Sequence, residues 1–259
     1  MPYAVVTGAS KGIGFHISEK LAERGYDLLL VARSEQQLVE AGQQITKRFP
    51  VKVQHLAMDL SLPESPALLV KHIHDQHLQV SVLVNNAGFG VWGKFESTPL
   101  KQIVEMMEVN MSAMVKLTHL LLPEMEKQTP AYILNIASTA AYQAVPTLGC
   151  YAASKSFVVL FSRALDYELR SKNITVTCFS PGPTITNFNH RAGIDDPVVI
   201  KRSERFGMNA AEVAGMAVDA LFKRKKEVVP GWMNKISSSL TSIAPKWMVE
   251  RVAAGLYEK

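Results

Sequence analysis

A tyrosine and a lysine stand four residues apart in the segment from Tyr151 to Lys155. Positions i and i+4 lie one turn apart on one face of a helix, and an apolar stripe at helical spacing continues after Lys155. A nearby ammonium group favours the phenolate form of a tyrosine and lowers a pKa that is ordinarily about 10, which makes the tyrosine a usable proton donor or acceptor. Taken alone, such a pair more often marks a solvated helix edge, so the rest of the chain must decide.

The length and composition suit one large globular domain, or at most two small ones. The chain has 259 residues, of which 47% are hydrophobic and 20% charged, which is enough to bury a substantial core. Its two cysteines, Cys150 and Cys178, exclude a disulfide framework and a cysteine metal cluster and fit a reducing cytoplasm. The chain starts directly in a strand-like run, so we expect no signal peptide. No apolar run reaches the roughly 20 residues of a membrane span.

The net charge of +5 is confined to the C-terminal part of the chain. Residues 1–200 hold 17 basic and 17 acidic side chains, whereas residues 201–259 hold 11 basic and 6 acidic ones. A nucleic-acid-binding stripe would need basic residues spread along the domain. We therefore expect no nucleic-acid partner.

A glycine-rich turn follows the first predicted strand, Tyr3 to Thr7, and precedes a helix that runs to about Arg24. The pattern G-x-x-x-G-x-G suits a tight turn, close approach of the backbone to a pyrophosphate, and a helix N-terminus whose free amides bind the anion. Methyltransferases and plain packing turns also use glycine here, so the turn alone does not decide the function. The candidate cofactor-binding residues of the turn are Gly8, Ser10, Lys11, Gly12, Ile13 and Gly14.

The second predicted strand, Asp27 to Ala32, ends beside a cation instead of an acid. NAD-binding folds place an acidic residue near this position for the ribose hydroxyls, but Arg33 stands here and Lys11 lies in the glycine-rich turn. Two cations that converge on the ribose suit a 2′-phosphate, so the sequence predicts NADP(H) as the cofactor. The alternative is a pair of solvated surface cations.

Asp59 and Leu60 follow a third predicted strand, Val51 to Met58. The carboxylate can accept a hydrogen bond from an adenine amino group, or it can be the N-cap of the helix expected after Pro63. That helix carries three histidines, but only two of them would share a face, so a solvated surface is the better interpretation and we predict no bound metal. The three are His72, His74 and His77, of which the last two would share the face.

Asn85-Asn86-Ala87-Gly88 follows the fourth predicted strand, Val80 to Val84, at the edge where open α/β sheets bind ligands. The small residues of this segment admit a cofactor, while Asn86 can hydrogen-bond backbone and hold neighbouring strands in place. A long helix is predicted from Glu105 to Met125. It carries Asn110, a residue type that is disfavoured inside helices, and either a function or a surface position would explain it.

The remaining segments continue the alternation of strands and helices. Ser138 ends a fifth strand, Tyr151 opens the next helix, and a sixth strand leads into Pro181-Gly182-Pro183-Thr184-Ile185-Thr186. The expected elements are strands at residues 131–137, 175–180 and 227–229 and a helix at 210–224. Strands that are apolar throughout and alternate with helices predict a parallel sheet covered on both faces. The fold class is therefore α/β, one doubly wound domain over residues 1–230.

Apolar residues also follow the strands at the candidate site. If their side chains converge above the cofactor, the substrate is a mostly apolar compound of middling size. The alternative is that they pack against the C-terminal residues and never meet substrate. They are Phe89, Val91, Trp92 and Phe95 after the fourth strand, and Val145, Leu148 and Phe188 further along.

Residues 231–259 are predicted to form an amphipathic extension of the domain. It could be a lid over the site, an oligomer interface or a membrane-surface helix, and packing within the protein or an oligomer is the default. Its basic residues include Lys235, Lys246 and Arg251. Its apolar stripes consist of Trp232, Met233, Ile236, Leu240, Ile243, Trp247, Met248, Val252 and Leu256.

Together these motifs resemble the short-chain dehydrogenase/reductase family, in its bacterial branch related to 3-ketoacyl reductases. The resemblance implies a Rossmann fold and an NADP(H)-dependent oxidoreductase that transfers a hydride between NADPH and a ketone or aldehyde. It runs from residue 3 to about residue 230 and rests on Thr7–Gly14, Asn85–Gly88, Asn110, Ser138, Tyr151, Lys155 and Pro181–Thr186.

The family's scheme implies four catalytic positions. Tyr151 would be the acid–base group, with Lys155 as its electrostatic partner and a ribose ligand. Ser138 would donate to the substrate oxygen, and Asn110 would order a water near Lys155. The implied cofactor contacts are these Tyr and Lys residues, the glycine-rich turn, Arg33, Asp59, Leu60, Asn86, Ala87, Gly88, Pro181, Gly182, Thr184 and Thr186.

The resemblance also implies a homo-oligomer, a dimer or tetramer, although the C-terminal extension departs from the common length. Two rival functions are left. A noncatalytic NADP(H)-binding sensor or scaffold usually loses the Tyr or the Lys, and this chain keeps all four positions. A membrane-peripheral reductase would place residues 232–259 on lipid. The sequence does not name the substrate, because loops change freely on a constant sheet.

Overall fold

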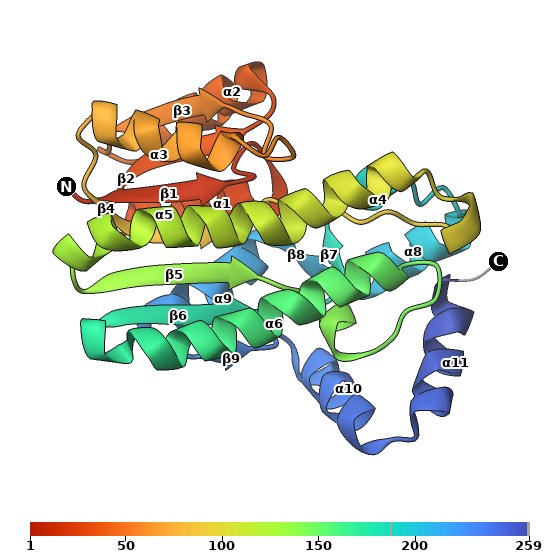
Figure 1. Cartoon of the computed structure of the whole chain (residues 1–259). Coiled ribbons are helices and arrows are strands. Elements are labelled where there is room, and N and C mark those ends of the chain that lie inside the picture. Colours follow the sequence, from red (N-terminus) through yellow and green to blue (C-terminus); the bar gives the residue numbers. More distant parts are fainter. Residues whose placement is uncertain (187, 258–259) are drawn as a thin grey trace.

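The computed structural model describes residues 1–186 and 188–257, apart from the side chains of residues 202–204, 242, 243, 256 and 257. Within this part of the chain, seven parallel strands form one sheet in the order β3-β2-β1-β4-β5-β6-β9 (Figure 1). The strands are β1 (Tyr3–Thr7), β2 (Asp27–Ala32), β3 (Val53–Ala57), β4 (Val80–Asn85), β5 (Ala131–Ile136), β6 (Ile174–Phe179) and β9 (Glu227–Val228).

Helices cover both faces of this sheet, which confirms the predicted doubly wound fold. Apolar residues of α1 (Gly12–Glu23), α2 (Glu35–Thr46) and α9 (Ala210–Phe222) share one core cluster with the strands. On the other face lie α3 (Ser65–Asp75), α5 (Ala113–Lys127) and α6 (Gly149–Leu169). Because both faces are covered, β1, β4 and β6 are buried at every residue, as continuous apolar runs in a parallel sheet require.

The winding of the chain opens a crevice at the carboxyl edge of the sheet. Strand β1 pairs with β2 on one side and with β4 on the other. In the sequence, β2 and β3 lie between β1 and β4. The connections therefore switch direction between β1 and β4, and ligands of open α/β sheets bind beyond such a switch point. The glycine-rich turn after β1, the Asn-Asn-Ala-Gly segment after β4 and Ser138 after β5 all meet at this edge.

The long helix predicted from Glu105 to Met125 is present as an unbroken helical run, but it is longer and it is not α-helical throughout. It consists of α4 (Leu100–Met107), a π-helical turn η2 (Glu108–Ser112) and α5. The helix α6 starts at Gly149, two residues before the predicted start at Tyr151.

The prediction for the histidines was also wrong in one respect. The helix α3 ends at Asp75, and His77 beyond it has a φ of 52°, so His74 and His77 do not share a helix face. His74 instead lies 3.5 Å from a carboxylate oxygen of Glu124. In the part of the chain that the structure describes, no group of three His, Cys, Asp or Glu side chains is placed to hold a metal ion.

Several elements beyond the carboxyl edge were not predicted. They are α7 (Phe188–Ala192), α8 (Pro197–Phe206) and a two-stranded parallel ladder of β7 (Thr184–Ile185) and β8 (Met208–Asn209). The predicted extension contains α10 (Trp232–Ile243) and α11 (Lys246–Tyr257), which lie beyond the same edge (Figure 1). The side chains of Ile243 and Leu256 lie outside the described residues. Among the described helices, none is long and apolar enough to cross a membrane.

A ladder of four buried side chains ties two helices to the middle of the sheet. Asn85 Nδ2 donates hydrogen bonds to Thr118 Oγ1 on α5 at 3.1 Å and to Asn135 Oδ1 on β5 at 2.9 Å. Asn135 Nδ2 in turn donates to Ser162 Oγ on α6 at 2.9 Å. All four side chains are buried, so water does not compete for these bonds. The ladder therefore fixes α5 and α6 relative to β4 and β5.

Replacing Asn135 with Ala should lower the free energy of unfolding by about 2–4 kcal/mol. The change removes two buried hydrogen bonds and leaves buried polar atoms of Asn85 and Ser162 without them. Urea unfolding measures the effect. The exposed Gln102→Ala is the control and should stay within about 0.5 kcal/mol of the unmodified protein. Equal stability of the two variants would show that the ladder contributes little.

Candidate active site

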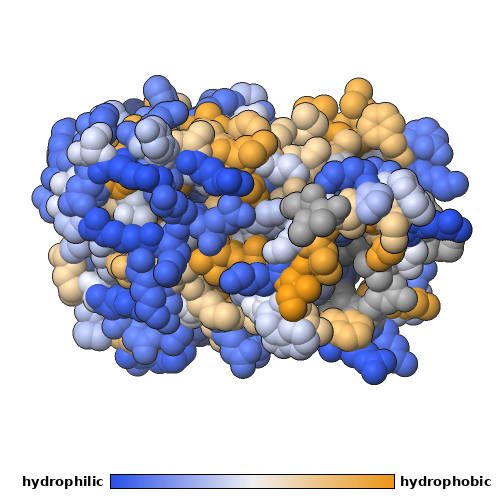
Figure 2. All heavy atoms as spheres, turned by 90° about the horizontal axis from the view of Figure 1, so that it is seen from below, coloured by the Kyte–Doolittle hydropathy of each residue, from blue (hydrophilic) through white to orange (hydrophobic). Residues whose placement is uncertain are grey.

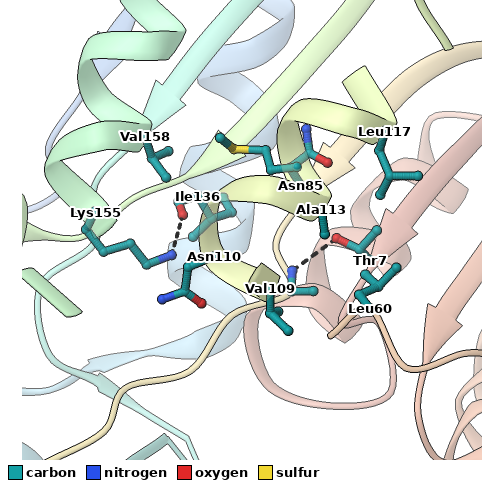
Figure 3. Close-up of a pocket in the computed structure, with 12 residues that line it drawn as sticks. Thr7, Leu60, Asn85, Val109, Asn110, Ala113, Leu117, Ile136, Lys155 and Val158 are labelled. Carbon is teal, nitrogen blue, oxygen red and sulfur yellow. Dashed lines mark hydrogen bonds between the residues drawn. The ribbon is translucent and has the colours of Figure 1, made fainter. Parts of the chain in front are cut away.

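A cleft of about 760 Å³ opens beyond the carboxyl edge of the sheet. Of the predicted catalytic residues, Ser138, Tyr151 and Lys155 line it, whereas Asn110 lies against a much smaller cavity that Lys155 also borders (Figure 3). All predicted cofactor-binding residues line the cleft as well: Gly8, Ser10, Lys11, Gly12, Ile13, Gly14, Arg33, Asp59, Leu60, Asn86, Ala87, Gly88, Tyr151, Lys155, Pro181, Gly182, Thr184 and Thr186.

The glycine-rich turn is shaped so that only glycine fits at its key positions. Gly8 has a φ of +67°, and a β-carbon on Gly14 would collide with the Gly8 carbonyl oxygen and with Asn86. The amide of Asn86 donates to the carbonyls of Thr7 at 2.9 Å and Gly8 at 3.2 Å, which confirms its predicted role of holding neighbouring backbone. Lys11, the N-cap of α1, makes no side-chain bond to the first amides of the helix. The turn thus presents backbone donors to the cleft, and it fits a pyrophosphate.

The loop after β6 closes onto this turn. Thr184 Oγ1 donates to the carbonyl of Gly182 at 3.0 Å, and Thr186 Oγ1 accepts the Phe188 amide at 3.2 Å. A β-carbon on Gly12 would lie 3.3 Å from the Thr186 side chain, so the loop and the turn are in contact range. Both therefore border the same part of the cleft.

Arg33, Arg191 and the carboxylate of Asp59 line the cleft near the end of β2. Partial burial tends to raise the pKa of the Asp59 carboxyl, but hydrogen bonds from Ser61 and the two arginine charges outweigh it and lower that pKa. Burial and the charge of Arg33 likewise lower the pKa of Arg191. The guanidinium of Arg191 stands 4.9 Å from the centre of the Phe89 ring. Arg191 was not predicted, because no motif in the sequence singles out a cation in the short helix α7.

Asp59 is not the N-cap of α3. Glu64 occupies that position, and Asp59 Oδ1 accepts hydrogen bonds from the amide and the hydroxyl of Ser61 at 3.0 and 2.8 Å. The N-cap alternative is therefore wrong. The carboxyl lines the cleft, two residues after the end of β3.

Asn110 lies in the π-helical turn η2, a type of turn that often occurs at functional sites. Its Oδ1 accepts the Phe89 amide at 3.1 Å, and its Nδ2 donates to the Phe89 carbonyl and to Ser154 Oγ, both at 3.0 Å. The side chain thereby joins the loop after β4 to α6. A β-carbon on Gly88 would lie 3.0 Å from Asn110 Oδ1 and 3.3 Å from Lys155 Nζ. This close approach requires a small residue at position 88.

Lys155 is a buried ammonium group. It is 5% exposed, and its Nζ donates to the carbonyl of Ile136 at 2.9 Å (Figure 3). Burial disfavours the charged form and lowers its pKa to about 8, with a smaller opposite effect from Cys178. At pH 7 the Lys155 side chain is therefore mostly in its positively charged form. The Nζ lies 5.9 Å from the centre of the Tyr151 ring, so the predicted pairing on one helix face is present in the structure.

Tyr151 and Ser138 reach the cleft from different elements. Tyr151 is 7% exposed, and its ring centre lies 5.4 Å from that of Phe188. Ser138 follows β5, and the amide of the next residue, Thr139, donates to the carbonyl of Pro181 at 2.9 Å. This bond fixes the serine turn to the loop after β6. Ser138 and Tyr151 therefore line the same cleft, and the buried ammonium of Lys155 lies beside the tyrosine ring.

The apolar lining of the cleft is only partly the one predicted. Val145, Leu148 and Phe188 line it as expected, whereas Phe89, Val91, Trp92 and Phe95 do not. The first three of these pack against the cluster that holds Tyr151, and Phe95 is 72% exposed. Ile194 and Val199 add unpredicted apolar lining, and α10 adds an unpredicted polar stripe of Asn234, Ser237, Ser238 and Thr241.

The sequence of this chain matches a known protein family. The short chain dehydrogenase family model matches residues 2–196. The very-long-chain 3-oxoacyl-CoA reductase of Mus musculus is 31% identical over 258 residues, which cover 98% of this chain and 78% of that protein.

Solved structures give the same result. A short-chain dehydrogenase from Sphingobium yanoikuyae in complex with NADPH has a TM-score of 0.81 and 27% identity, over 95% of this chain and 96% of its own. The L-sorbose reductase from Gluconobacter frateurii, complexed with NADPH and L-sorbose, has a TM-score of 0.78 and 27% identity, over 88% and 94%. The matches include complexes with NADPH and also a complex with NAD. The chain therefore belongs to the short-chain dehydrogenase family of oxidoreductases.

Proposed function

We propose that this protein reduces a ketone or aldehyde to the alcohol, or catalyses the reverse oxidation, with NADP(H) as the hydride carrier. The observation that carries the proposal is the convergence of Ser138 and Tyr151 on one cleft, with the buried ammonium of Lys155 beside the tyrosine ring. The glycine-rich turn, which fits a pyrophosphate, lines the same cleft.

The residues around the cleft suit a bound dinucleotide. When bound, NADPH supplies the hydride for the carbonyl carbon. The backbone donors of the glycine-rich turn would hold its pyrophosphate, and Thr184 and Thr186 would hold the pyrophosphate and the nicotinamide amide. Lys155 would bind the ribose, and Asp59 would lie beside the adenine.

The chain's own groups would manage the developing charge and the proton. Ser138 and Tyr151 donate hydrogen bonds to the carbonyl oxygen, where negative charge develops. Tyr151 gives its proton to that oxygen, and the ammonium of Lys155 stabilises the phenolate that is left. The small cavity beside Asn110 and Lys155 has a volume of about 10 Å³, close to the room that one water needs. A water there would relay a proton from the solvent to Lys155, which passes one on to Tyr151.

Replacing Tyr151 with Phe should lower kcat by about 10²–10⁴-fold, because the change removes only the proton donor. NADPH binding, followed by its fluorescence, should change little. Tyr167→Phe is the matched control, since Tyr167 lies on the same helix and is 74% exposed. A Tyr151→Phe enzyme within a few-fold of the unmodified one would contradict the assignment.

The rival function, a noncatalytic NADP(H)-binding sensor or scaffold, makes a different prediction for the unmodified protein. Such a protein would bind NADPH but consume none with any ketone, aldehyde, 3-ketoacyl thioester or steroid. The retention of Ser138 and Tyr151 beside Lys155 at one cleft favours the enzyme, because a protein that only binds the cofactor needs no proton donor there.

We infer a preference for NADP(H) from the cations near the end of β2. Lys11, Arg33 and Arg191 line the cleft, and Arg33 lies close enough to Arg191 to lower its pKa. Neighbouring guanidinium groups repel each other, and a 2′-phosphate between them would relieve the repulsion through charge-assisted hydrogen bonds.

Changing Arg33 to Asp should weaken NADPH binding by about tenfold or more and leave NADH binding similar or stronger. The substitution removes a phosphate-binding cation and adds a carboxylate that repels the 2′-phosphate. Titration of the variant with both cofactors gives the ratio of the two Kd values. Lys101→Asp, at a side chain 86% exposed on α4, controls for net charge. An unchanged ratio in Arg33→Asp would mean that the ribose lies elsewhere.

We further propose a mostly apolar substrate of middling size. The support is the apolar lining of the cleft by Val145, Leu148 and Phe188, with Ile194 and Val199 from the segment after β7. The polar stripe of α10 borders the same cleft, so a polar group at one end of such a substrate would find partners there.

Catalytic efficiency should climb along a homologous series of ketones before steric limits intervene. Each buried methylene contributes about 0.8 kcal/mol, which corresponds to about a fourfold gain in kcat/KM. Steady-state NADPH oxidation with each ketone measures it. Flat efficiency along the series, or a clear preference for sugars and other polyols, would show that the apolar residues do not contact the substrate.

Homo-oligomer formation and a cytoplasmic location stay predictions. In support of the first, Leu100 and Val104 on α4 and Leu160 on α6 are more than half exposed. Large apolar side chains of this kind on neighbouring helices suit a contact with a second copy.

A further inference from the structure

The helix α10 turns its polar face toward the protein and its apolar face toward solvent, which is the reverse of an ordinary surface helix. Its buried stripe is polar: Ser238 and Thr241 are 8% and 7% exposed, and with Asn234 they line the cleft. Their hydroxyls donate within the helix, from Ser238 to the carbonyl of Asn234 at 2.6 Å and from Thr241 to that of Ser238 at 2.7 Å. A surface helix of a globular protein normally turns its apolar stripe inward. The opposite face of α10 therefore needs an explanation.

That opposite face is apolar and exposed. At least half of each of its four large apolar side chains is accessible, and α11 adds three more, which are 45–67% exposed. Figure 2 looks at this side of the molecule and shows apolar side chains gathered on the half where α10 and α11 lie, whereas the other half is mostly polar. We name this the tail surface; it consists of Trp232, Met233, Ile236, Leu240, Trp247, Met248 and Val252.

Basic side chains accompany the tail surface. Lys235 and Arg251 are exposed on the same two helices, and Lys246 starts α11. Among the described residues of α10 and α11, three side chains are basic and one, Glu250, is acidic, so the formal charge of these helices is +2. The whole excess of +5 in the chain lies within residues 201–259. An apolar face with tryptophans and flanking cations is typical of helices that lie in a membrane interface.

We propose that the tail surface docks the protein on an anionic lipid bilayer, with α10 and α11 lying in the headgroup region. The tryptophan rings and aliphatic side chains would sit at the boundary of headgroups and acyl chains. Lys235 and Arg251 would reach the lipid phosphates, with their alkyl stems on the apolar side. The positive charge of the tail helices complements the negative charge of the lipid headgroups.

A second copy of the chain fits the tail surface less well. Closed dimers are usually isologous, so each patch faces the same patch of its partner. Such a contact would bring a face of charge +2 against another of the same sign, and like charges across an interface disfavour it. An anionic bilayer has the opposite charge.

The mouth of the cleft opens beside the tail surface. Phe206 of α8 and Val252 of α11 both line the cleft, and they are 56% and 67% exposed. An apolar compound dissolved in lipid would thus meet apolar side chains at the mouth without crossing bulk water. Docking itself does not depend on the proposed reductase activity.

Co-sedimentation of the full chain with vesicles tests the proposal. The protein should bind vesicles of phosphatidylcholine mixed with phosphatidylglycerol more tightly than vesicles of phosphatidylcholine alone. The double variant Ile236→Ser with Leu240→Ser should lose at least about tenfold in binding, because it removes two apolar side chains that lipid would bury. Lys235→Gln with Arg251→Gln should lose about tenfold or more on the mixed vesicles only.

Leu62→Ser with Leu68→Ser is the matched control, since both leucines are about half exposed and lie by α3, away from α10 and α11 (Figure 1). It should bind like the unmodified protein. Circular dichroism and melting temperature check that each variant is folded, and NADPH consumption in vesicle-free buffer tests the reductase separately. Absent vesicle binding, or binding that both tail variants leave unchanged, overturns the proposal. So does a solution dimer that the Ile236/Leu240 variant dissociates, because a second copy then covers the tail surface.

Discussion

The burial of the Lys155 ammonium is the constraint on which the arrangement of the site depends. A charged group taken out of water is stable only where fixed acceptors and close packing compensate it. The carbonyl of Ile136 at the end of β5 provides one such acceptor. A β-carbon on Gly88 would crowd the ammonium, so glycine lets the loop after β4 run close to it, and Asn110 in the π-helical turn holds that loop in place. A glycine, a π-helical turn and an asparagine that are far apart in the sequence thus come together beside one buried charge.

The cleft has two regions with different chemistry. Near the end of β2, Arg33 and Arg191 concentrate positive charge, and the glycine-rich turn adds backbone donors, so this region suits phosphate groups. Around Tyr151, apolar side chains from the segments after β5 and β7 reduce contact with water. A low-dielectric setting strengthens the effect of a nearby charge on a phenol. The cleft therefore offers positive charge in one region and the hydroxyl groups of Ser138 and Tyr151 in the other.

Much of the fold follows from sequence, because a strand buried on both faces must be apolar at every position. Strand β2 was predicted residue for residue. The turn after β1 could be predicted from its glycines, because β-carbons at Gly8 and Gly14 would clash and these positions therefore require glycine. The π-helical turn was not foreseen, since it spans only Glu108–Ser112, and a one-residue shift over so short a stretch resembles ordinary irregularity in an apolar stripe. Arg191 was missed because its neighbours Arg33 and Asp59 are distant in sequence. Periodicity revealed the two stripes of the extension, but it does not tell which stripe faces the protein, and in α10 the polar one does.

The ladder from Thr118 through Asn85 and Asn135 to Ser162 has a consequence for conditions of use. It consists of amide and hydroxyl groups, none of which titrates in the pH range where proteins are folded. Its bonds are also shielded from dissolved ions, because all four side chains are buried. The spacing between α5 and α6 is therefore insensitive to acidity and ionic strength. We therefore expect a response of this protein to those variables to arise at its ionisable residues, since the ladder that holds the two helices is electrically neutral.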